Sequence, residues 1–111
     1  MLFNLNSATS VNITEDTRGA KATATVSATS TVSVALAANP LRAAYSIYNA
    51  GPATVFLREG AVVTSTLYDV AIPSGFYWKE DFPSARYLGA VSVITAASGT
   101  ASLQVSEGTL I

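Results

Sequence analysis

Apolar and polar residues alternate along most of the chain from Thr31 onward. Val32, Val34 and Leu36 would face one side of a strand, with Thr, Ser and Ala on the other. A period of two is typical of a strand with one buried face. The same alternation recurs, between turn-forming stretches, over 43–49, 55–58, 68–72, 76–79, 87–96 and 101–105. The pattern predicts an all-β protein, an antiparallel β-sandwich of jelly-roll-like or Ig-like build.

Residues 38–60, "ANPLRAAYSIYNAGPATVFLREG", predict a β-hairpin with a turn at "NAGP". Asn and Gly tolerate positive φ, and Pro52 cannot donate to a ladder. Tyr48 and Phe56 would lie on the exposed face of this hairpin. The alternative is that both pack in the second sheet of the same sandwich. Farther along, the adjacent Val93 and Ile94 predict a β-bulge.

Residues 1–29 have a different composition, rich in Asn, Ala, Ser and Thr with only weak alternation. Such a segment cannot bury much apolar surface, so we expect it to be extended. The predicted organisation is an N-terminal arm over 1–29 and a β-sandwich domain over 30–111. The arm would dock on a neighbouring subunit, and its removal would leave the domain folded. A frayed terminus and an edge strand of the same domain are the alternatives.

The composition favours a component of an assembly. The chain has 111 residues, which suits one domain, and only 12% of them are charged, with a net charge of −1. A surface so poor in charge is favourable when partners cover it; the alternative is a small neutral β-protein. We find no basic stripe for nucleic acid and no cationic amphipathic helix for a membrane. No Cys is present, so no disulfide framework is expected.

The side chains that usually carry catalysis are scarce. The chain has no His, which removes the commonest general base and metal ligand. Lys21 and Lys79 lie in polar segments, where they would stay solvated. Glu80 and Asp81 are adjacent, so on a strand they would point to opposite faces rather than form a catalytic pair. We therefore expect no enzyme, no catalytic residue, no cofactor, no metal and no small-molecule substrate. The alternative is a sugar site at Trp78 beside these carboxylates.

A series of turn and strand-end signals runs through residues 30–107. They are Ala38-Asn39-Pro40, Arg42, Ile47 to Asn49, Ile72-Pro73-Ser74-Gly75, Phe76 to Trp78, Gly89 to Val91, and Gly99 to Glu107. This series resembles a small β-domain of tailed-phage virion proteins. The resemblance implies a capsid decoration (cement) protein on the virion surface, made in the host cytoplasm. Its partners would be the major capsid protein and further copies of itself, with a trimer favoured. A tail or connector component, or a carbohydrate-binding β-sandwich module centred on Trp78 and Tyr77, is the alternative.

The expected interface residues are an apolar tip, three arginines and several aromatic side chains. Arg and aromatic residues are enriched at interfaces, although a single Arg at a strand end is also ordinary. The predicted set is Met1, Leu2, Phe3, Leu5, Arg42, Tyr48, Phe56, Arg58, Trp78 and Arg86.

Overall fold

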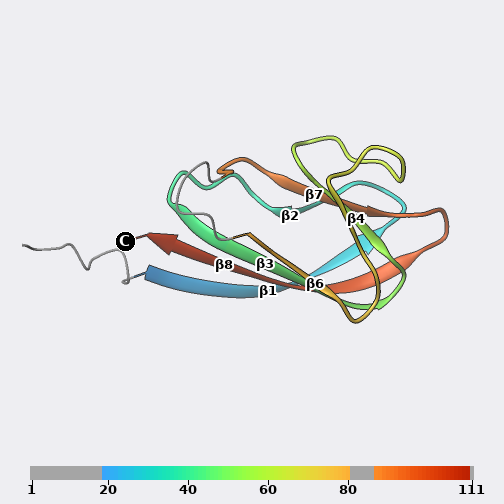
Figure 1. The fold of residues 1–111 in the computed structure, drawn as a ribbon, viewed down its shortest axis with the longest axis horizontal. Helices are drawn as coiled ribbons and strands as arrows, with labels where there is room; N and C mark the ends of the chain where they lie inside the picture. The colour runs from blue at the N-terminus through green and yellow to red at the C-terminus, as the bar shows by residue number, and fades with distance from the viewer. Residues whose placement is uncertain (1–18, 81–86, 111) are drawn as a thin grey trace, which may run out of the picture.

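The computed structural model describes residues 19–80 and 87–110, which form eight strands in two antiparallel four-stranded sheets (Figure 1). Sheet A has the order β1 (Gly19–Thr29), β8 (Thr100–Leu110), β3 (Arg42–Pro52) and β6 (Tyr77–Glu80). Sheet B has the order β2 (Ser33–Leu36), β7 (Val91–Thr95), β4 (Val55–Glu59) and β5 (Val70–Ile72). The described residues include no helix. The predicted antiparallel β-sandwich is therefore confirmed.

The two sheets enclose one apolar core. Ile47 and Leu103 from sheet A and Val55 and Val93 from sheet B are all fully buried. Along β3 the burial alternates, with Tyr45, Ile47 and Asn49 facing inward and Tyr48 facing out. The alternation of apolar and polar residues in the sequence therefore reflects the burial of one face of β3.

The hairpin predicted over residues 38–60 is wrong, because β3 and β4 belong to different sheets. The chain leaves β3 at a corner that contains a cis peptide bond between Gly51 and Pro52. The Asn49 side chain, inside the sandwich, donates 2.8 Å hydrogen bonds to the carbonyls of Ala53 and Ile72. Its Oδ1 accepts a 2.8 Å bond from the Gly51 N–H. The turn residues therefore carry the chain across the core instead of folding it back.

Strand β1 lies within the segment that was expected to be an arm. Residues 19–29 pair with residues 110–100 of β8 in an unbroken antiparallel register, and Ala28 is fully buried in the core. The expected boundary at residue 29 is therefore corrected, since the sandwich includes Gly19–Thr29 as an edge strand. Small Ala and Thr side chains made this strand's alternation weak. The rest of the predicted arm, with its apolar tip, lies outside the described residues.

Strand β2 departs from the predicted alternation. Its register with β7 shifts between Val34 and Leu36, so Ala35 and Leu36 are both buried while Val34 is 57% exposed. The bulge expected at Val93 and Ile94 is wrong, because both residues pair regularly with β4. The register shift lies instead on the neighbouring strand β2.

Candidate interaction surface

Arg42 begins β3 at one end of the sandwich, and its guanidinium is almost completely buried. Nε lies 2.7 Å from a Glu107 carboxylate oxygen. The terminal nitrogens donate to the carbonyls of Tyr87 and Gly89 at 2.9 Å and of Ala37 at 2.7 Å. The planar fork of Arg suits such a set of acceptors. Arg42 thus joins the ends of both sheets, and its use inside the fold corrects the expectation of an interface contact.

The same end contains a buried tyrosine. Tyr45 lies beneath the Arg42 guanidinium, which is 5.5 Å from the ring centroid, and its hydroxyl donates a 2.8 Å hydrogen bond to Glu59. Burial raises the pKa of the Tyr45 hydroxyl above its ordinary value of 10.0, and the hydrogen bond and charge of Glu59 raise it further. A tyrosine that holds its proton so firmly is a structural donor, not a base.

The Ala-Asn-Pro signal also serves the fold. Asn39 Oδ1 accepts a hydrogen bond from the Leu41 N–H at 3.0 Å, and the Asn39 carbonyl accepts one from the backbone N–H of Arg42 at 3.1 Å. Its Nδ2 lies 3.2 Å from Thr109 Oγ1, which ties this turn to the end of β8. Asn39, like Arg42 and Asn49 of the same series, therefore makes turn and packing contacts within the fold.

An exposed pair of tyrosines is the main aromatic feature of the outer face of sheet A. Tyr48 of β3 and Tyr77 of β6 are directly opposite in the antiparallel register, with 43% and 68% of their surface exposed. Residues opposite each other on one face lie close enough for their rings to form a shared surface. Phe76, just before Tyr77, is 62% exposed. We call Tyr48 and Tyr77 the aromatic patch. Sequence reasoning placed Tyr48 at an interface but did not pair it with Tyr77.

The other predicted interface residues are placed differently. Phe56 is half-buried on sheet B, with its ring 4.8 Å from the Tyr68 ring between centroids. Arg58 is half-buried and donates to the Val62 carbonyl at 3.0 Å. Trp78 packs against the core, so it cannot share one sugar-binding surface with Tyr77. Two further parts of the predicted set, Arg86 and the apolar tip, lie outside the described residues.

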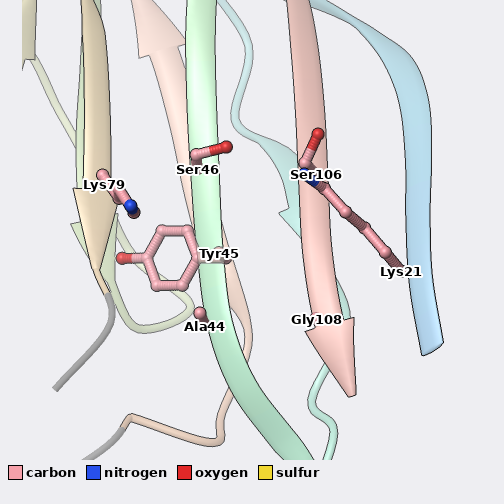
Figure 2. A pocket seen from close by; sticks show the side chains of 7 residues that line it. All are labelled: Lys21, Ala44, Tyr45, Ser46, Lys79, Ser106 and Gly108. Carbon is pink, nitrogen blue, oxygen red and sulfur yellow. The ribbon is translucent and has the colours of Figure 1, made fainter. Parts of the chain in front are cut away.

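A shallow depression of about 180 Å³ lies on sheet A (Figure 2). It forms where Gly108 and Ala44 leave space, and Ser46, Ser106, Tyr45, Lys21 and Lys79 complete its lining. Figure 2 shows the Lys21 side chain extending from β1 across β8 toward Ser106. Both lysines are exposed, whereas a lysine that activates a serine is desolvated. The Ser106 hydroxyl is 3.1 Å from that of Thr23. Among the described residues that line the depression there is no carboxylate, so we assign it no acid–base chemistry.

Searches for two other kinds of site were negative. Within residues 19–80 and 87–110, no group of three or more Asp, Glu, His or Cys side chains is placed to hold a metal ion. In the same part of the chain, no helix is long and apolar enough to cross a membrane.

Comparison with known proteins gives one distant structural similarity. No family model matches the chain, and no curated protein matches it. Among solved structures, a chain from Bacillus endospore appendages, described as "a novel family of disulfide-linked pili", is similar to this one. The similarity covers 93% of this chain and 99% of that chain, with 17% identity and a TM-score of 0.44. At these values it carries no argument about function.

Proposed function

We propose that this protein is a non-enzymatic structural subunit of a tailed-phage virion, a decoration protein that binds the capsid surface as a homo-oligomer. The observation that carries the proposal is the aromatic patch, exposed on a regular sheet face. Exposed aromatic clusters are typical of protein interfaces, where Tyr often contributes much of the binding energy. The small share of charged residues, 12%, also supports a role in an assembly.

The major capsid protein is the proposed partner. Sheet A offers it a broad outer face with Tyr48 and Tyr77 at one side. Over the rest lie mostly hydroxyl side chains, together with Lys21, Lys79 and Gln104. Binding would bury this face against more than one capsid subunit and so stabilise the shell. Its docking strands, β3 and β6, are anchored to the core by Ile47 and Trp78 on the opposite face.

The test is co-sedimentation with bare capsid shells of the phage that encodes the protein. We expect saturable binding that falls at least about tenfold in the double variant Tyr48→Ser/Tyr77→Ser, because two central aromatic contacts are worth more than 1.4 kcal/mol. Val62→Ser is the matched control, since Val62 is 56% exposed on the β4–β5 loop, away from the aromatic patch. Its binding should be unchanged.

Two results would contradict this proposal. Absence of wild-type binding to shells, with binding to isolated tails instead, would favour a tail or connector component. Saturable binding on a glycan array, lost in the same tyrosine double variant, would favour a carbohydrate-binding module. The paired tyrosines support that second candidate, because adjacent exposed rings can stack on a sugar face.

A further inference from the structure

The four sheet edges of the sandwich are very unequal. Three edge strands are short: β2 and β6 have 4 residues each and β5 has 3. The fourth, β1, has 11. Natural proteins usually protect sheet edges by shortness, bulges, Pro or charge, and β2 adds a register shift to its short length. Strand β1 is the edge that most lacks such protection.

The β1 edge is regular along its whole length. Its pairing with β8 runs from Gly19 to Thr29 without a register shift, and it has no Pro and only one charged residue, Lys21. In an antiparallel ladder every second residue directs its N–H and C=O away from the existing partner. Among residues 19–80 and 87–110, no strand pairs with this outer side of β1. The edge therefore presents a row of backbone donors and acceptors to another strand.

The inward face of β1 is also partly uncovered. Ala28 is fully buried, but Ala20, Ala22 and Ala24 are exposed although they lie on the same side of the strand. Sheet A therefore continues beyond the cover that sheet B provides at β1. A strand added beside β1 would extend this row of small apolar side chains.

We propose that β1 pairs antiparallel with β1 of a second copy, so that the two A sheets join into one continuous sheet. The strand is self-complementary. A two-fold axis at Ala24 pairs Lys21 with Ser27, and one at Thr25 pairs Lys21 with Thr29. In both registers the two Lys21 side chains lie at opposite ends, so no like charges are opposed. Apart from Lys21, the side chains that meet are Ala, Val, Ser and Thr, which pack closely. The pairing uses β1 of both copies and closes at a dimer, in contrast to the trimer that the virion resemblance implies.

The proposal is tested on the full chain without shells, by light scattering and sedimentation equilibrium. We expect a concentration-dependent dimer that Thr25→Lys converts to a monomer, because this exposed position lies at or next to the two-fold axis. Gln104→Lys is the matched control. Gln104 is the ladder neighbour of Thr25 on β8 and donates to its hydroxyl at 3.0 Å, so both variants lose the same hydrogen bond. Only Thr25→Lys puts the new charge on the edge strand.

A second measurement gives the position of the contact. The natural chain has no Cys, so Thr25→Cys with a short thiol cross-linker should yield a covalent dimer, whereas Ala61→Cys on the exposed β4–β5 loop should not. A wild-type monomer at every concentration would overturn the proposal. So would an oligomer whose mass Thr25→Lys leaves unchanged. Shell binding is measured separately and depends on the aromatic patch. A monomeric wild type would remove the homo-oligomeric state from the proposed function but leave the shell contact standing, and failed shell binding would leave the dimer standing.

Discussion

At the scale of single residues, the buried Arg42 side chain makes four hydrogen bonds at one end of the sandwich. Arg42→Met removes the partner of Glu107 and leaves three carbonyls without their donor. We expect a loss of about 3–5 kcal/mol in the free energy of unfolding, the usual cost of breaking a buried ion pair. Chemical denaturation measures it. Arg58→Met is the control and should cost less than about 1 kcal/mol, so equal losses would refute the assignment.

Tyr45 gives the fold a dependence on alkaline pH. Its pKa is raised in the folded state, first by burial and then by Glu59, so the unfolded chain loses this proton at lower pH. The stabilisation is complete below the unfolded pKa of about 10 and declines as the pH rises above it. Denaturation midpoints measured from pH 8 to 11 should fall more steeply for the wild type than for Tyr45→Phe. Parallel curves for the two proteins would contradict this explanation.

At the scale of elements, β1 decides where the domain begins. A variant that starts at Gly19 keeps every described contact, and we expect it to unfold at nearly the wild-type temperature. A variant that starts at Ser30 loses β1, and with it the buried Ala28. The edge of β8 and the part of the core that Ala28 covers would then be exposed. We expect it to lose cooperative unfolding in circular dichroism and calorimetry. Equal midpoints for both truncations would restore the boundary at residue 29.

The sequence predicted strands better than it predicted their pairing. Period-two alternation located β3, β4 and β8 because large apolar side chains alternate there, but it missed β1, whose inward residues are mostly Ala. Turn composition located the Gly51-Pro52 corner without revealing that the chain changes sheets there, since that depends on distant acceptors such as the Ile72 carbonyl. The Tyr48–Tyr77 pair depends likewise on the register between β3 and β6. The sequence of one strand does not show which residues it will face on another strand.

At the scale of the whole molecule, the two proposed surfaces lie on opposite margins of sheet A. Strand β1 forms one edge, and Tyr77 lies on β6 at the other. A paired dimer would keep both outer faces on the same side, because residues directly opposite in a ladder point the same way. Both aromatic patches would then face one capsid surface. Two linked contacts bind far more tightly than either contact alone when the spacing allows both, so dimerisation would strengthen attachment to the shell.

The partnership of the first and last described strands also has a consequence for biosynthesis. Gly19 pairs with Leu110, and the whole of β1 pairs with β8. A ribosome therefore releases β1 long before its partner has been made, and this edge of sheet A can close only after β8 has emerged. Pairings between such distant segments form slowly. During that interval the nascent strand is exposed along both sides, and neighbouring nascent chains on the same messenger RNA would be the first to encounter it.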